Sequence, residues 1–466
     1  MKKYKKGSKK LLNAWVIYDW ANSVYPLVIS TAIFPIFYGM VTEDYITFLG
    51  YSFKNTALIS YITAFAFVIL VFLSPLLSGI ADYTGGKKFF MKFFCYSGSF
   101  ACILLYWFDI DNLNSSLVYY FIALIGFWAS LVFYNSYLPE IAYPEQQDKL
   151  SAKGYAMGYI GSVILLLVNL IMINYPEHFG IIDSNGVLAQ NYYFLHQFGL
   201  NNFFQDFTVY FYQLEAMKIS FIMVGVWWFL FSQYTFYNLP GRKYYKQLRL
   251  KKNSSIENKN LIFSGFHELK VVWDELKNNQ TLKVFLTAFF IYSIALQTVI
   301  LVATYFGEAE INWNEGEKTF GLILSILLIQ LIAVVGAILS AKISERIGNL
   351  RTLISLNIIW ALICVFGYYI ETPTEFYIAA GLVGLVMGGI QALSRSTFSK
   401  FIPPTTNNTS YFSFYDVSQK LSIVIGMTLF ATIDQITGSM RNSILVFLVF
   451  FVAGAIILVR LNKKIA

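Results

Sequence analysis

Residues 318–341 read Lys318-Thr-Phe-Gly-Leu-Ile-Leu-Ser-Ile-Leu-Leu-Ile-Gln-Leu-Ile-Ala-Val-Val-Gly-Ala-Ile-Leu-Ser-Ala341, with no charge after the first position. A helix needs about 20 predominantly apolar residues to cross the roughly 30 Å hydrocarbon core of a bilayer. The stretch meets that length and therefore predicts a membrane-spanning helix.

The rest of the chain repeats this pattern. Of its 466 residues, 57% are hydrophobic and only 13% are charged, whereas soluble domains carry about 25% charged residues. We expect an all-α membrane protein with twelve transmembrane helices. The predicted spans are Ala14–Met40, Ala57–Ile80, Phe89–Phe108, Ser116–Leu138, Ala152–Asn174, Glu215–Asn238, Leu282–Phe306, Lys318–Ala341, Thr352–Ile370, Glu375–Ser399, Ser410–Ile433 and Asn442–Leu461.

The segments between these spans alternate in charge. Lys and Arg gather at 2–10, 87–92, 149–153, 242–277, 342–351, 400 and 463–464, whereas the segments at 109–111, 175–214, 308–317 and 371 are acidic or neutral. Basic residues favour the cytoplasmic side of a membrane. The alternation predicts a multi-pass protein of the inner membrane with both termini in the cytoplasm. It also explains the net charge of +8 without a nucleic-acid partner, since no nucleic-acid-binding motif is present.

Two halves of six helices suggest an internal duplication. We expect one six-helix bundle over residues 1–238, with a periplasmic loop at 175–214, and a second over residues 282–466. Residues 239–281 form the predicted cytoplasmic linker, with a surface helix around Phe266–Leu276. Within the periplasmic loop, Phe203–Tyr212 could form an amphipathic segment on the membrane surface.

Equivalent loops of the two halves carry a related pattern. Asp82, Gly85 and Lys87 follow the second span, and Glu345, Arg346 and Gly348 follow the eighth. Glycine permits a tight turn, and an acid can pair with a base or with a helix N-terminus. The pattern resembles the signature loop of the major facilitator superfamily, which implies a cytoplasmic gating loop. The alternative is a generic tight turn.

Four charged residues lie inside the predicted spans and at least four residues from either end. They are Asp19, Arg395, Asp416 and Lys420, all in the cytoplasmic half. Ionisable groups in hydrocarbon cost about 2.5–3.5 kcal/mol on insertion scales and usually mark function. We expect a charge network that forms and breaks as the inner side closes and opens, with Asp19 as a proton-binding carboxylate. A static structural network is the competing interpretation.

Uncharged polar groups accompany these charges. Asn22, Ser23 and Gln391 lie near the predicted midplane, where they could contact a polar solute or hydrogen-bond between helices. Pro26 and Pro35 are expected to break the first helix, and Gly388-Gly389 to loosen the tenth, freeing backbone groups for binding.

Four motifs resemble the vacuolar-effluxer-like (autophagy-related) family of the major facilitator superfamily. They are Tyr18-Asp-Trp-Ala-Asn-Ser23, Phe133-Tyr-Asn135-Ser-Tyr-Leu-Pro139-Glu140, Gly388-Gly-Ile-Gln391-Ala-Leu-Ser-Arg395-Ser396 and Phe414-Tyr-Asp416-Val-Ser-Gln-Lys420. The resemblance implies two six-helix bundles around a central cavity. We expect a secondary transporter that moves a small polar solute, with amino acids or short peptides as candidates, across the inner membrane by alternating access. The resemblance itself implies amino-acid export, and Asn135 is among the candidate site residues.

Other functions fit the sequence less well. An enzyme is not expected, because the three histidines lie in loops and neither a metal cluster nor a nucleophile–base pair is visible. A multidrug or sugar carrier of the same fold and a non-transporting membrane sensor remain alternatives. We expect no cofactor and no metal. The expected partners are a small-molecule solute, the lipid bilayer and protons as a coupling ion, and the expected state is a monomer.

Overall fold

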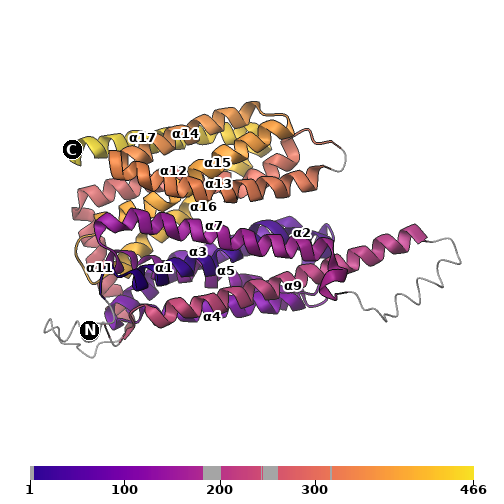
Figure 1. The fold of residues 1–466 in the computed structure, drawn as a ribbon, viewed down its shortest axis with the longest axis horizontal. Coiled ribbons are helices and arrows are strands. Elements are labelled where there is room, and N and C mark those ends of the chain that lie inside the picture. The colour runs from indigo at the N-terminus through magenta and orange to yellow at the C-terminus, as the bar shows by residue number, and fades with distance from the viewer. Residues whose placement is uncertain (1–4, 182–200, 243, 245–260, 315–316, 466) are drawn as a thin grey trace.

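The computed structural model describes residues 5–181, 201–242, 244, 261–314 and 317–465. Within these residues, twelve helices are long and apolar enough to cross a membrane. Figure 1 shows them running roughly side by side along the long axis of the molecule. The prediction of twelve membrane-spanning helices is confirmed.

The first six spans occupy the N-terminal half. Their elements are α1 (Lys9–Asn22), η1 (Tyr25–Ala32), α2 (Ile33–Val41), β1 (Tyr45–Phe48), β2 (Tyr51–Lys54), α3 (Asn55–Thr84), α4 (Lys87–Leu104), η2 (Leu105–Trp107), α5 (Leu113–Asn135), α6 (Leu138–Ile141), α7 (Pro144–Asn174), η3 (Pro176–Phe179) and α9 (Asn201–Asn238). The antiparallel strands β1 and β2 form a hairpin between the first two spans.

The C-terminal half continues after the linker helix α11. Its elements are α11 (Leu261–Asn278), α12 (Gln280–Glu310), α13 (Lys318–Ile347), α14 (Asn349–Tyr369), α15 (Pro373–Phe401), α16 (Asn408–Thr437) and α17 (Met440–Ile465). The predicted linker helix around Phe266–Leu276 therefore exists and is longer than expected.

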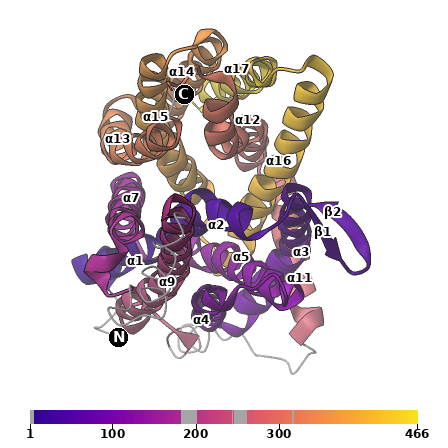
Figure 2. The ribbon, with the colours of Figure 1, turned by 90° about the vertical axis from the view of Figure 1, so that its right-hand side faces the viewer.

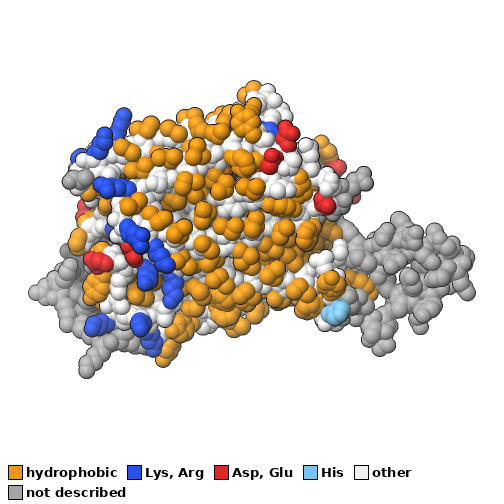
Figure 3. Space-filling view, turned by 45° about the horizontal axis from the view of Figure 1, so that its top comes forward, with side chains coloured by type: hydrophobic (Ala, Val, Ile, Leu, Met, Phe, Trp, Pro, Cys, Tyr) orange, Lys and Arg blue, Asp and Glu red, His pale blue; other side chains and the backbone are white. Residues whose placement is uncertain are grey.

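The molecule has two chemically different ends. Both termini lie at one end, here called the terminal end, and the β1–β2 hairpin lies at the other, the hairpin end. Figure 3 shows the visible Lys and Arg mainly at the terminal end, Asp and Glu at both ends, and a hydrophobic band between the two ends. This is the surface expected of a protein that crosses a bilayer with its helix ends in water.

The helices form two six-helix bundles that meet along a few of them. One hydrophobic core lies among the first six spans and another among the last six. Between the bundles, α7 packs against α13 and α15, and α3 packs against α16. The candidate site described below lies at this interface, with charged residues on α1 and α15 and polar residues on α5 and α7.

The first span is irregular, as its prolines predict. The α-helical turns of α1 end at Asn22, and η1 is a stretch of π-helix that opens with Pro26 in its first turn. Thr31 Oγ1 donates to Pro26 O at 2.8 Å, which satisfies a carbonyl in the widened turn. A π-helical stretch inside an α-helix often accompanies a functional site.

The tenth span is not loosened at Gly388-Gly389, contrary to the sequence prediction. The helix α15 runs unbroken from Pro373 to Phe401 through Gly388 and Gly389. A Cβ added at Gly388 would overlap the backbone of Ala333 in α13, and a Cβ added at Gly389 would overlap the side chain of Ser340 in the same helix. These glycines therefore allow two helices to approach closely and do not loosen α15.

The predicted loop at 175–214 is shorter in the structure than in the sequence analysis. The helix α9 begins at Asn201, not at Glu215, and η3 occupies Pro176–Phe179. Part of the predicted loop, residues 182–200, lies outside the described residues. A helix satisfies its own backbone hydrogen bonds, so α9 can extend beyond the apolar segment that predicted it.

Candidate functional site

Arg395 of α15 crosses the interface and binds the N-terminal bundle. Its Nη2 donates to Asp19 Oδ2 at 3.2 Å and to Ser151 O at 3.0 Å. Its Nε donates to Ser151 Oγ at 2.9 Å, and its Nη1 donates to Asn135 Oδ1 at 3.3 Å. One arginine thus joins α15 to α1, α5 and α7.

Aromatic rings of the N-terminal bundle surround the same guanidinium. The carbon Cζ of Arg395 lies 4.6 Å from the ring centroid of Trp15, 4.2 Å from that of Tyr155 and 5.7 Å from that of Tyr134. Aromatic faces attract cations, more strongly where water is excluded. The planar guanidinium fits this slot in a way that a lysine ammonium would not.

The Asp19–Arg395 pair is almost completely removed from solvent. Only 3% of the Arg395 side chain and 8% of the Asp19 side chain are exposed. Breaking a buried ion pair by removing one partner typically destabilises a protein by about 3–5 kcal/mol, because the other charge is left uncompensated. The pair is therefore a strong contact between the bundles only while both members stay together.

Gly154 of α7 leaves the space in which this pair forms. A Cβ at Gly154 would overlap Asp19 Oδ2 and would lie 3.1 Å from Arg395 Nη2. Four residues later, a Cβ at Gly158 would overlap Ser23 Oγ. Sequence reasoning missed both positions, although their Gly-x-x-x-Gly spacing is a known signal for close helix packing in membranes.

Asp416 and Lys420 form a second, separate pair. They share one face of α16 and pair with each other. Lys420 Nζ also donates to Ser74 Oγ of α3 at 3.3 Å and lies 5.9 Å from the ring centroid of Trp128. The four charges predicted as one network therefore form two pairs, one between the bundles and one within a helix.

A second group of polar residues lies nearer to the middle of the membrane-spanning helices than Arg395 does. Tyr159 Oη donates to Gln391 Oε1 at 2.7 Å, which joins α7 to α15. Ser23 Oγ donates to Asn22 Oδ1 at 3.4 Å. Asn22 is 2% exposed, and its Nδ2 has no hydrogen-bond partner within the described part of the chain. A solute between the bundles could accept from this amide.

The loop after α3, predicted to be a gating loop, connects the bundles at the terminal end. Asp82 accepts backbone hydrogen bonds from Thr409 N at 3.2 Å and Ser410 N at 2.7 Å, in the first turn of α16. Helix N-termini favour negative charge because their amides are unpaired and the helix dipole is positive there. Gly85 ends α3 with a φ of 67°, and Lys87 pairs with Glu140, which also accepts from Asn408 Nδ2 at 3.0 Å.

The second copy of the loop is built differently. Gly348 has a φ of 90°, as a tight turn requires, but Glu345 and Arg346 are exposed. The next residue, Asn349, donates to Asp148 Oδ1 of α7 at 2.7 Å. Asp148 also pairs with Lys400. Sequence reasoning missed this cluster, because Asp148, Asn349 and Lys400 are far apart in the chain.

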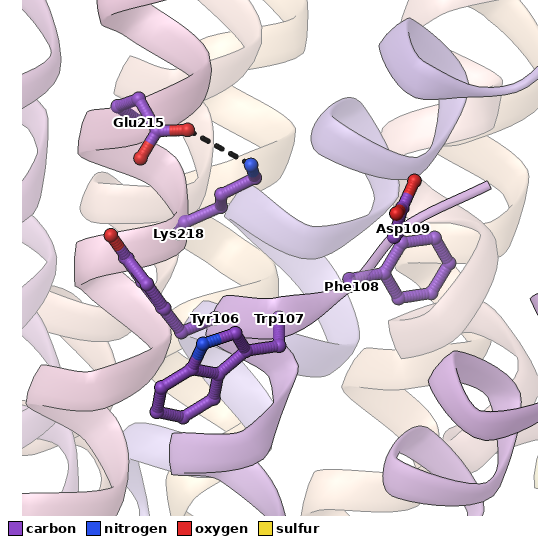
Figure 4. Close-up of a pocket in the computed structure, with 6 residues that line it drawn as sticks. All are labelled: Tyr106, Trp107, Phe108, Asp109, Glu215 and Lys218. Atoms are coloured by element: carbon purple, nitrogen blue, oxygen red, sulfur yellow. Dashed lines mark hydrogen bonds and ion pairs between the residues drawn. The ribbon is translucent and has the colours of Figure 1, made fainter. Parts of the chain in front are cut away.

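A small pocket of about 350 Å³ lies at the hairpin end, away from these charges. Figure 4 shows Tyr106 and Trp107 on one side of it and the Glu215–Lys218 ion pair, 2.9 Å long, on the other. It lies within the N-terminal bundle. In the described ranges there is no group of three or more His, Cys, Asp or Glu residues placed to hold a metal ion.

The chain matches the family described as vacuole effluxer Atg22 like over residues 7–465. It belongs to that family. The uncharacterized MFS-type transporter YxiO of Bacillus subtilis is 30% identical over 447 residues, which cover 96% of this chain and 93% of YxiO. Autophagy-related protein 22 of Saccharomyces cerevisiae is 23% identical over 83% of this chain and 74% of its own length.

Solved structures show the same fold at low sequence identity. The major facilitator transporter FucP, in its outward conformation, superposes with a TM-score of 0.67 at 13% identity and covers 97% of both chains. The proton:xylose symporter XylE superposes with a TM-score of 0.65 at 13% identity, over 96% of this chain and 94% of XylE. The expected major facilitator fold and the expected family are confirmed.

Replacement of Gly154 by alanine should disrupt the Asp19–Arg395 pair. The added methyl group would occupy the position of Asp19 Oδ2, and forcing an extra carbon into a packed interior costs about 1–3 kcal/mol. We expect a lower melting temperature in detergent micelles. Gly39→Ala is the matched control, because a Cβ at Gly39 of α2 meets nothing within 4 Å, and alanine favours a helix by up to about 1 kcal/mol. Equal melting temperatures for the two variants would contradict the packing described here.

Proposed function

We propose that this chain is a secondary transporter that moves a small polar solute by alternating access between two bundles. The supporting observation is the Asp19–Arg395 pair, which is buried, charged and shared between bundles. A permanently closed interface gains little from such a pair, since apolar side chains of similar volume are often as stabilising or more so. A pair that must open and close repeatedly gains from being specific and reversible.

The terminal end is the cytoplasmic side in this proposal. Most of the Lys and Arg visible in Figure 3 lie there, and cytoplasmic loops carry an excess of these residues. The structure then represents a state closed to the cytoplasm. The Asp82, Asp148 and Asp19–Arg395 contacts join the bundles at successive depths from that side. In the proposed motion, residues 1–238 move as one unit relative to residues 282–466, and residues 239–281 link the two.

Opening the cytoplasmic side separates Arg395 from Asp19 and exposes both to the space that forms between the bundles. Each charge then needs a new partner, since an unpaired charge is costly at this depth. A proton can neutralise Asp19, and an anionic group of the solute can pair with Arg395. This exchange of partners couples proton binding to the position of the bundles, because a protonated Asp19 no longer holds Arg395 as a carboxylate does.

An amino acid or short peptide suits such a site. Its carboxylate matches the bidentate fork of arginine, and its ammonium group matches the faces of Trp15 and Tyr155. The unpaired amide of Asn22 adds a donor closer to the middle of the helices. The family description, a vacuole effluxer, agrees with solute movement across a membrane.

A disulfide across the interface should lock the protein. Ser136 Oγ and Thr409 Oγ1 lie 3.4 Å apart, one in each bundle, and cysteines at such spacing can be oxidised with modest adjustment. In a background without Cys95, Cys102 and Cys364, Ser136→Cys/Thr409→Cys should transport only after reduction. We would measure solute counterflow in proteoliposomes with and without reductant.

The matched control joins two helices of one bundle. Ser232→Cys next to the native Cys95 has the same 3.4 Å separation, between α9 and α4. Oxidation of this pair should leave counterflow unchanged. Full counterflow through the oxidised Ser136→Cys/Thr409→Cys protein would rule out alternating access by these bundles.

Asp19→Asn should uncouple transport from the proton gradient. Asparagine can still accept a hydrogen bond from Arg395 but can no longer take up a proton. We expect proton-driven uptake of amino acids such as leucine, lysine or glutamate to be lost, while counterflow of the same solute persists and shows that the protein is folded. Asp111→Asn, at an exposed site of the hairpin end, is the control. Undiminished proton-driven uptake in Asp19→Asn would exclude Asp19 as the coupling group, and counterflow of xylose but of no amino acid would favour a sugar carrier.

A further inference from the structure

The β1–β2 hairpin stands outside the helical bundles. It connects α2 to α3 at the hairpin end, and Figure 2 shows it projecting sideways past α3, beyond the outline of the neighbouring helices. The space beside a membrane-spanning helix is filled by lipid. An element that leaves a helix end sideways therefore lies over the bilayer surface and not over the transport path.

Hydrogen bonds hold the base of the hairpin in this direction. Tyr38 Oη donates to Asn55 O at 3.1 Å, and Asn55 N donates to Asp44 O at 2.9 Å. Asn55 Nδ2 donates to Thr42 Oγ1 at 3.1 Å, and this hydroxyl donates to Tyr38 O at 2.6 Å. The hairpin is thus tied to the end of α2 and the start of α3, which fixes where its tip points.

The register of the strands gives the hairpin two different faces. Cross-strand partners share a face, and faces alternate along a strand. The pairs Ile46–Phe53 and Phe48–Tyr51 make one face wholly apolar. The pairs Tyr45–Lys54 and Thr47–Ser52 make the other face mainly polar. On the apolar face, Ile46 is buried in the N-terminal core, Phe48 and Phe53 are partly buried against that core, and Tyr51 beside the tip is exposed.

The turn at the tip contains an unexpected residue. Leu49 has a φ of 50° and Gly50 a φ of 83°, and a two-residue turn with two positive φ values normally contains Asn, Asp or Gly. Leu49 is the one non-glycine residue with positive φ in the described ranges, and it is 74% exposed. The positive φ disfavours leucine at this position, and the exposed side chain gains little from packing against protein. Contact with an apolar solvent would favour leucine here.

The apolar face of the hairpin continues an exposed apolar row on α3. Tyr61, Phe65, Val68 and Phe72 recur at helical spacing and are all exposed. The ring of Phe53 meets the ring of Tyr61 edge to face, with centroids 6.3 Å apart. The lipid-facing surface of α3 thus extends without interruption into the hairpin.

We propose that the tip of the β1–β2 hairpin inserts into the bilayer interface and anchors the adjoining ends of α2 and α3 there. Leu49 enters the acyl boundary, and Tyr51 lies at headgroup level, where amphipathic rings concentrate. The polar face, with Thr47 and Ser52, stays in water. The partner is the lipid surface itself, and the proposal does not depend on which solute the protein carries.

Spin labels at single cysteines in proteoliposomes test this proposal directly. Leu49→Cys reports on the tip, and Thr47→Cys and Ser52→Cys, both exposed on the polar face, are matched controls. The native Cys95, Cys102 and Cys364 are buried and are replaced in the background. Collision rates are measured with oxygen, which concentrates in lipid, and with a neutral nickel chelate, which stays in water. The Leu49 label should collide several-fold less with nickel than the two control labels, and more with oxygen.

Two results would overturn the proposal. Nickel collisions at Leu49 equal to those at Ser52 would place the tip in water. A label protected from both reagents would place the tip against protein, such as a second copy of this chain. Leu49→Asn separates folding from anchoring, because asparagine accepts the turn geometry more readily than leucine. It should preserve the melting temperature in detergent while shifting a label at Phe48→Cys toward nickel access in vesicles, and no shift would contradict anchoring by Leu49.

Discussion

The ion pair between Asp19 and Arg395 is the interaction on which the arrangement of the two bundles depends. Hydrocarbon disfavours isolated charges by several kcal/mol, so each member holds the other in place. The pair lies between α1 and α15 with its remaining donors used by Ser151 and Asn135. Because its members belong to different bundles, relative movement of the bundles changes the charge state or the partners of both.

The contacts nearer the terminal end also join a buried acid of one bundle to a donor of the other. Asp82 accepts a hydrogen bond from a backbone amide at the N-terminus of α16. Asp148 pairs with Lys400 and accepts a hydrogen bond from Asn349. Each acid of one bundle meets a donor of the other. In the proposed mechanism, water reaches the helix N-terminus and Lys400 when the bundles separate at the terminal end, and the buried Arg395 contact contributes most to the stability of the closed state.

Much of the fold follows from the sequence, because the low charge of the spans and the alternating charge of the loops are local properties. The site was predictable only in part. Asp19 and Arg395 stood out as charges in apolar spans, but their pairing depends on how α1, α7 and α15 pack, and on the absence of a Cβ at Gly154. The loop after α13 shows the same limit: the sequence singled out Glu345 and Arg346, which are exposed, whereas Asn349 makes the contact with Asp148. Glycines at 388 and 389 pack against α13, and no local pattern distinguishes that from a hinge.

The distance between the bundles at the terminal end tests the central role of the ion pair most directly. Spin labels at Lys9→Cys in α1 and Arg460→Cys in α17, both exposed, would report it by pulsed electron resonance in lipid nanodiscs. With Asp19 and Arg395 intact, the distribution should be dominated by the shorter, closed distance. Asp19→Asn and Arg395→Gln should each shift it toward a longer, open distance, because hydration then becomes the better partner for the remaining group. An unchanged distribution in both folded variants would contradict the account.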